Sequence, residues 1–254
     1  MTGDDLVPRL RAAGVVFAEE EARLLAAAAS GAALDALVDR RAAGEPLEPL
    51  LGWAAFDGLR VPVDPGVFVP RRRTELLARE AAALATPGAL VLDLCCGTGA
   101  VGLAIATRVP GVQVHAADVE PAAVANARRT LAPVGGTVRQ GDLFDPLPER
   151  LRGRFAVIAV NAPYVPTDRI ADMPREARDF EPAVALDGGP DGLDLHRRIA
   201  AEAPAWLAPG GALLIETGRT QAAWTALLLE QAGLVAGIES DDEVDGTVAI
   251  GLAR

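Results

Sequence analysis

Lysine is missing from this chain, and arginine, its only strong base, is outnumbered by acids. All 24 basic residues are arginines against 35 acidic residues, so the formal net charge is −11. Duplex nucleic acid is usually bound by a basic face, and this balance therefore argues against nucleic acid as a direct partner. A local cluster of arginines could still provide such a face.

Long apolar runs and a disulfide framework are absent too. No run approaches the roughly 20 apolar residues that span a bilayer, and residues 1–11 contain no apolar signal-peptide core. The two cysteines, Cys95 and Cys96, are adjacent, so they cannot bridge distant segments. His115 and His196 lie far from them in sequence, and we expect no metal site. A cytoplasmic protein without membrane association is expected.

Helical and strand periodicities alternate along most of the chain. Residues 4–45 are rich in Ala, Leu, Arg and Glu at helical spacing, and a short hairpin that turns at Asp57-Gly58 follows. From Thr74 onward the alternation implies an α/β fold, a mostly parallel sheet with helices on both faces. The expected helices are 74–86, 100–108, 121–132, 191–207 and 220–233. The expected strands are 89–94, 112–118, 137–141, 155–160, 211–217, 235–240 and 246–252, with an aperiodic segment at 165–190.

A glycine-rich turn directly follows the apolar strand at 89–94. Gly97, Gly99 and Gly102 form the pattern G-x-G-x-x-G. Glycines let the backbone turn sharply and approach a ligand, and the N-terminus of the next helix offers free N–H groups. Alone, the pattern is equally typical of a nicotinamide dinucleotide site or of close helix–sheet packing.

Three acids at the carboxyl ends of strands favour a methyl donor at this turn. Asp93 could hold the amino group of a methionine moiety, and Asp118 could accept hydrogen bonds from ribose hydroxyls. Asp142 could accept from an adenine amino group while Leu143 or Phe144 packs on the ring, although capping of a turn is an alternative for Asp142. Such folds bind ligands at this edge of the sheet. Together the acids predict a site for S-adenosylmethionine, with S-adenosylhomocysteine as product.

The tetrapeptide Asn161-Ala162-Pro163-Tyr164 ends the strand at 155–160 and suits a planar nitrogen acceptor. The side-chain oxygen of Asn161 and the carbonyl of Ala162 could accept the two N–H bonds of an amide or aromatic amine. The nitrogen lone pair would then point at the methyl group while Tyr164, the only tyrosine, walls the acceptor plane. A strand-end turn capped by Asn161 is the structural alternative.

These motifs resemble the HemK-like protein-(glutamine-N5) methyltransferases, which modify the glutamine of the Gly-Gly-Gln loop in peptide chain release factors. The similarity covers nearly the whole chain. It spans residues 41–47, 51–52, 63–71, 74–75, 93–100, 118, 141–144, 161–164, 181–182, 186–195 and 207–216. The resemblance implies S-adenosylmethionine contacts from Cys95, Cys96, Gly97, Thr98, Gly99, Asp118, Leu143 and Asn161. It also implies that residues 161–164 contact the glutamine, with Asn161, Pro163 and Tyr164 as the catalytic set.

The same resemblance implies a class I methyltransferase fold: a Rossmann-like seven-stranded sheet whose last strand is antiparallel. A substrate-binding helical domain is expected at 1–52, a hairpin linker at 53–73 and the methyltransferase domain at 74–254. The resemblance is to an atypical member of this family. Ala162 stands where the family usually has proline, and the run Arg71 to Arg73 replaces an Arg-Pro-Glu sequence.

We expect a monomeric enzyme that methylates a glutamine side-chain amide of a release factor. Two alternatives share the donor site: a glutamine methyltransferase acting on another translation protein, and an adenine-N6 nucleic-acid methyltransferase. A third is a non-catalytic relative that binds a partner through its helical domain, which the two departures keep open.

Overall fold

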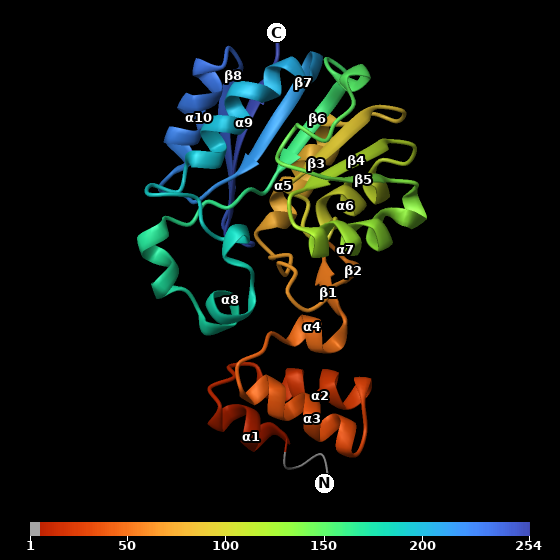
Figure 1. Cartoon of the computed structure of the whole chain (residues 1–254), viewed down its shortest axis with the longest axis vertical. Coiled ribbons are helices and arrows are strands. Elements are labelled where there is room, and N and C mark those ends of the chain that lie inside the picture. Colours follow the sequence, from red (N-terminus) through yellow and green to blue (C-terminus); the bar gives the residue numbers. More distant parts are fainter. Residues whose placement is uncertain (1–5) are drawn as a thin grey trace.

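A seven-stranded sheet forms the centre of the computed structural model, which describes residues 6–254 (Figure 1). Its strand order is β5-β4-β3-β6-β7-β9-β8, and β9 runs antiparallel to both of its neighbours. The other neighbouring pairs are parallel, which confirms the expected sheet with its antiparallel last strand. The strands are β3 Leu90–Leu94, β4 Gln113–Asp118, β5 Thr137–Gln140, β6 Phe155–Val160, β7 Leu207–Glu216, β8 Val235–Asp241 and β9 Gly246–Leu252.

Helices cover both faces of the sheet and bury a separate apolar core on each. Side chains of consecutive strand residues point to opposite faces, so Val91 belongs to one core and Leu92 to the other. Because both faces are covered, the central strands are nearly continuous apolar runs. One face carries α5 Thr74–Leu84, α6 Ala100–Arg108 and α7 Pro121–Leu131, and the other carries α9 Asp194–Glu202 and α10 Ala222–Gln231.

The N-terminal helices pack around a small core of their own, below the sheet in Figure 1. Leu10, Leu25 and Val38 are fully buried there. The helices are α1 Leu6–Ala12, α2 Ala18–Ala28 and α3 Ala32–Ala42; α4 Leu47–Leu51 and the hairpin β1 Trp53–Phe56 and β2 Leu59–Pro62 lead to the sheet. Residues 1–5 of the expected first domain lie outside the described residues.

A buried arginine connects these helices to the segment at 165–190. The Arg41 guanidinium pairs with the carboxylate of Glu21 inside the bundle and, at 2.7 Å, with that of Glu176 in α8 Arg175–Phe180. The segment, aperiodic in sequence, also contains 3-10 turns at Thr167–Asp172 and Ala183–Ala185. It therefore has a defined path between the bundle and the sheet.

The helix expected at 191–207 is shorter in the structure, where α9 covers Asp194–Glu202. Gly192 has a φ of 74°, and the Asp191 carboxylate accepts a hydrogen bond from the N–H of Leu193, so residues 191–193 form a turn. A 3-10 turn that includes Pro204 follows the helix, and β7 begins at Leu207, earlier than expected. Within the described part of the chain, none of the helices combines the length and apolarity needed to cross a bilayer.

Candidate active site

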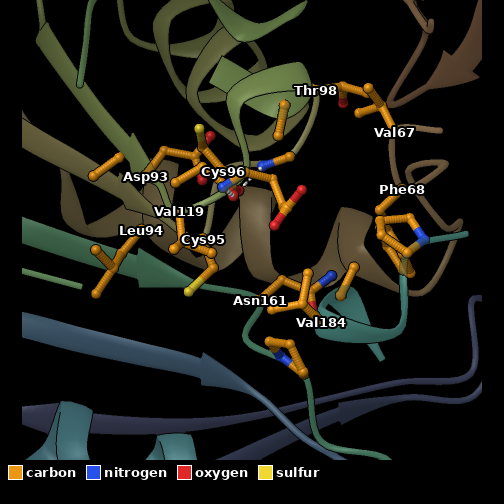
Figure 2. A pocket seen from close by; sticks show the side chains of 18 of the residues that line it. Val67, Phe68, Asp93, Leu94, Cys95, Cys96, Thr98, Val119, Asn161 and Val184 are labelled. Carbon is orange, nitrogen blue, oxygen red and sulfur yellow. Dashed lines mark hydrogen bonds between the residues drawn. The ribbon is translucent and has the colours of Figure 1, made fainter. Parts of the chain in front are cut away.

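A cavity of about 310 Å³ lies at the carboxyl ends of β3, β4 and β6. The strand order reverses here, because β4 and β6 lie on opposite sides of β3, and such switch points form ligand crevices. Figure 2 shows Asp93 and the glycine turn on one side of the cavity, with Phe68 and Val184 across from them. Ten of the expected site residues line it: Asp93, Cys95, Cys96, Gly97, Thr98, Asp118, Asp142, Leu143, Asn161 and Pro163.

The glycines of the turn have different roles. Gly97 lines the cavity with a φ of 50°, and a Cβ there would meet no atom within 4 Å. Gly99, expected at the donor, packs against α7, where a Cβ would lie 3.2 Å from side-chain atoms of Ala127 and Leu131. Gly102 packs under the turn, where a Cβ would approach the Asp93 carboxylate at 3.2 Å. Gly97 is therefore the glycine that leaves room for a ligand.

Two of the three acids hold the turn in place: Asp93 is buried and Asp118 is partly buried. The Asp93 Oδ2 accepts a hydrogen bond from the N–H of Gly102 at 2.8 Å. Burial raises the pKa of Asp93 to about 8, against the lowering effect of that hydrogen bond. The Asp118 carboxylate accepts from the N–H of Gly97 at 2.8 Å and of Glu120 at 3.0 Å, and burial raises its pKa also.

The third acid has a different environment. Asp142 is half exposed, and its Oδ2 lies 2.8 Å from a guanidinium nitrogen of Arg198, which also lines the cavity. Of the two side chains considered for an aromatic ring of the ligand, Leu143 lines the cavity. Phe144 is buried and stacks on Trp206 with ring centroids 5.8 Å apart, so its role is packing.

Strained backbone accompanies the cavity. Four non-glycine residues among those described have positive φ, and two of them, Cys95 and Leu143, line the cavity. The other two, Asp57 and Asp245, lie in hairpin turns. Left-handed backbone outside turns is costly and concentrates at functional sites, so this placement supports a ligand-binding role.

A second, smaller cavity of about 30 Å³ adjoins the first and shares Phe68, Asn161 and Pro163 with it. Ala162 and Tyr164 also line it, so the tetrapeptide borders both cavities. The Asn161 Nδ2 donates to the Thr74 hydroxyl at 3.2 Å, which leaves its Oδ1 as a free acceptor. The strand-end tetrapeptide thus presents a side-chain oxygen at the border of the two cavities.

Sequence reasoning missed several residues of this region. The Tyr164 hydroxyl donates to the Oε1 of Glu216 at 3.1 Å, and Glu216 is buried at the end of β7. The Glu181 Oε1 accepts from the N–H of Val69 at 3.1 Å and from Arg71 at 2.6 Å, which holds residues 182–185 over the larger cavity. An acid that ends an otherwise apolar strand was the available signal for Glu216.

The sheet order and the cavity at its switch point define a class I S-adenosylmethionine-dependent methyltransferase. The chemistry of the cavity fits that donor. The Asp93 and Asp118 carboxyls suit an ammonium group and ribose hydroxyls. Leu143 offers an apolar surface for adenine, and the open side of Gly97 leaves space beside the turn.

Comparisons with known proteins identify the family. The Methyltransferase small domain family matches residues 58–174. Release factor glutamine methyltransferase of Geobacter sulfurreducens is 42% identical over 193 residues, which are 75% of this chain and 67% of that protein. Its counterpart in Cereibacter sphaeroides is 37% identical over 271 residues, 98% of this chain and 95% of that protein. The chain belongs to the release factor glutamine methyltransferase family.

A solved structure supports the fold. The 16S rRNA N2 G1207 methyltransferase of T. thermophilus, in complex with AdoMet and guanosine, aligns with a TM-score of 0.55 at 22% identity. The alignment covers 80% of this chain and 50% of that one.

Proposed function

We propose that this enzyme methylates the side-chain amide nitrogen of a glutamine in a peptide chain release factor, at the Gly-Gly-Gln loop. The observation that carries the proposal is the orientation of Asn161, whose Oδ1 is left as an acceptor between the two cavities. When bound, S-adenosylmethionine supplies a methyl group on a positively charged sulfur.

The larger cavity is proposed to bind the donor. Asp93 would hold the ammonium group and Asp118 the ribose hydroxyls, while Asp142 and Leu143 would contact adenine. The other donor contacts proposed are Cys95, Cys96, Gly97, Thr98 and Asn161. Gly99 does not line this cavity and the side that its Cβ would occupy faces α7, so its proposed donor contact would be through the backbone.

The smaller cavity is proposed to bind the glutamine side chain. The Asn161 Oδ1 and the Ala162 carbonyl would accept the two amide N–H bonds, and Pro163 and Tyr164 would hold the amide plane. Both acceptors favour an amide nitrogen whose lone pair is localised and directed at the methyl group. This alignment of nitrogen and methyl group makes a strong base unnecessary for the transfer. Ala162 keeps the backbone carbonyl that this role needs, and the loss of a proline there costs only about 0.4–1 kcal/mol.

The smaller cavity, about 30 Å³, is too small for a folded surface. We therefore propose that the target glutamine projects from a loop of its protein. We propose that residues 1–52 hold that protein, that residues 53–73 link them to the methyltransferase domain at 74–254, and that the enzyme acts as a cytoplasmic monomer.

A labelling experiment tests the function. Purified enzyme and methyl-labelled S-adenosylmethionine are incubated with a release factor, with its Gly-Gly-Gln variant carrying Ala for Gln, or with adenine-containing oligonucleotides. The proposal requires label on the unmodified factor alone, and peptide mass spectrometry should show a gain of one methyl group on that glutamine. Label on the oligonucleotide, on the Ala variant or on nothing would each reject it.

A further inference from the structure

The backbone of Tyr164, the last residue of the tetrapeptide, is held by a side chain that lines neither cavity. The Nε2 of Gln221, the residue before α10, donates a hydrogen bond to the carbonyl oxygen of Tyr164 at 3.0 Å. The same nitrogen donates to the carbonyl oxygen of Asp191, also at 3.0 Å. A side-chain amide has two N–H donors, so both are in use. Gln221 therefore joins the tetrapeptide to the loop that precedes α9.

Two glycines of that loop leave the space in which this contact forms. A Cβ on Gly192 would lie 2.3 Å from both the Nε2 of Gln221 and the carbonyl oxygen of Tyr164, directly on the hydrogen bond between them. A Cβ on Gly188 would lie 2.8 Å from the Cα of Tyr164. Such distances are too short for any side chain, so only glycine lets the loop close on the backbone of Tyr164.

The side chain of Tyr164 has separate contacts. Its hydroxyl donates to the Oε1 of Glu216 at 3.1 Å, and its ring centroid lies 6.4 Å from that of the buried His196 in α9. These contacts hold the ring but leave the peptide group of Tyr164 free to rotate. The hydrogen bond from Gln221 fixes that peptide group.

We propose that Gln221 is a positioning residue for methyl transfer, an inference that rests on the proposed function. By fixing the carbonyl of Tyr164, it sets the direction of the tetrapeptide that receives the target glutamine. Pro163 has a restricted φ, so a rotation at Tyr164 would be passed on to the two proposed acceptors, Asn161 and Ala162. A displacement of about 1 Å in such a site can lower the rate about a hundredfold.

The Gln221→Met variant tests this inference because it keeps the length of the side chain and removes both donors. Tyr164 is the only tyrosine, so isotope-labelled tyrosine gives NMR ring signals from this site alone. We expect these signals to shift and broaden, and kcat on a release-factor domain to fall about tenfold or more. Donor affinity should stay unchanged, because neither Gln221 nor Tyr164 lines the larger cavity. Gln231→Met, at the exposed end of α10, is the matched control and should behave as wild type.

A second pair of variants blocks the same hydrogen bond from the other side. Gly192 and Gly210 have similar left-handed backbone, with φ of 74° and 72°. Gly192→Ala should reproduce the changed tyrosine signal and the loss of kcat. Gly210→Ala carries the same backbone strain, but its Cβ would meet no atom within 4 Å, so it should retain both properties.

A wild-type tyrosine signal or a wild-type kcat in Gln221→Met would overturn the inference, and so would equal effects of Gly192→Ala and Gly210→Ala. Failure of the wild-type enzyme to methylate the release-factor domain would instead reject the proposed function. The tyrosine signal would still report whether Gln221 holds Tyr164.

Discussion

Some side chains at the strand ends could be placed at the site from the sequence alone, and others could not. Asp118 and Asn161 could be predicted because each ends a strand whose neighbours meet at the same edge. The hydroxyl of Thr74 and the carboxyl of Glu216 could not, since their partners lie 87 and 52 positions away along the chain. Only the folded sheet brings such pairs together, so residue spacing in the sequence does not predict them.

The raised pKa of Asp93 predicts a pH-dependent donor affinity. At neutral pH this carboxyl group is mostly protonated in the free protein, because its pKa is about 8. An ammonium group favours the ionised form, so binding should lower the pKa and release a proton. Donor affinity should therefore rise with pH up to about 8, by at most about tenfold per pH unit, and then level off.

Titration calorimetry between pH 6 and 9, in buffers of different ionisation enthalpy, measures both the affinity and the released proton. Asp93→Asn should bind more weakly and without this pH dependence. A wild-type affinity that stays constant across the range would contradict the assigned role.

Asn161 predicts a separation of turnover from donor binding. Asn161→Ala removes the side-chain acceptor but leaves the walls of the larger cavity otherwise intact. We expect kcat to fall by about a hundredfold, with donor affinity changed by no more than a few-fold. Steady-state kinetics together with equilibrium donor binding measure the two effects, and normal turnover would rule out the acceptor geometry.

At the scale of elements, hydrophobic periodicity located the strands and most helices, and it failed where local turns intervene. α6 and β6 have the expected bounds, whereas α9 starts later because the Asp191 side chain stabilises a turn before it. The pattern G-x-G-x-x-G predicted the turn before α6 correctly. It could not assign roles to the glycines, because those depend on how α7 packs against the turn.

Two substitutions in this turn should separate stability from donor binding: one should mainly lower the free energy of unfolding, and the other should mainly lower donor affinity. Gly99→Ala combines a φ of 77° with close contacts to α7, so we expect a loss of about 2–4 kcal/mol in unfolding free energy and near-normal donor affinity. Gly97→Ala places its methyl in open space at the cavity wall. It should cost only about 1–2 kcal/mol in stability but weaken donor binding tenfold or more.

Denaturant unfolding and donor titration of both variants provide the comparison. Equal losses of affinity in the two variants would show that Gly99 also contributes to the donor site.

At the scale of the whole molecule, one guanidinium links the N-terminal helices to the segment that covers the larger cavity. The Arg41 side chain is 6% exposed and pairs with Glu21 and Glu176, from α2 and α8. The sequence showed Arg41 only as part of a family motif. Its partners lie in separate regions of the chain, so their convergence could not be predicted.

Arg41→Ala should destabilise the N-terminal helices by about 3–5 kcal/mol, because it leaves the buried Glu21 carboxylate without its partner. Hydrogen exchange in residues 6–42 should accelerate, and KM for the protein substrate should rise while donor affinity stays constant. Arg40→Ala breaks a more exposed pair with Glu45, worth at most about 1 kcal/mol, and is the control. Unchanged exchange in the Arg41 variant would refute the link.

The left-handed backbone at Cys95 and Leu143 makes the wall of the crevice costly to form. Each such residue disfavours its own conformation by about 1–3 kcal/mol, so the packing of the chain around it must compensate. Part of the stability of the sheet therefore goes into holding the shape of one small crevice, and substitutions that loosen the packing there should alter that shape before they unfold the protein.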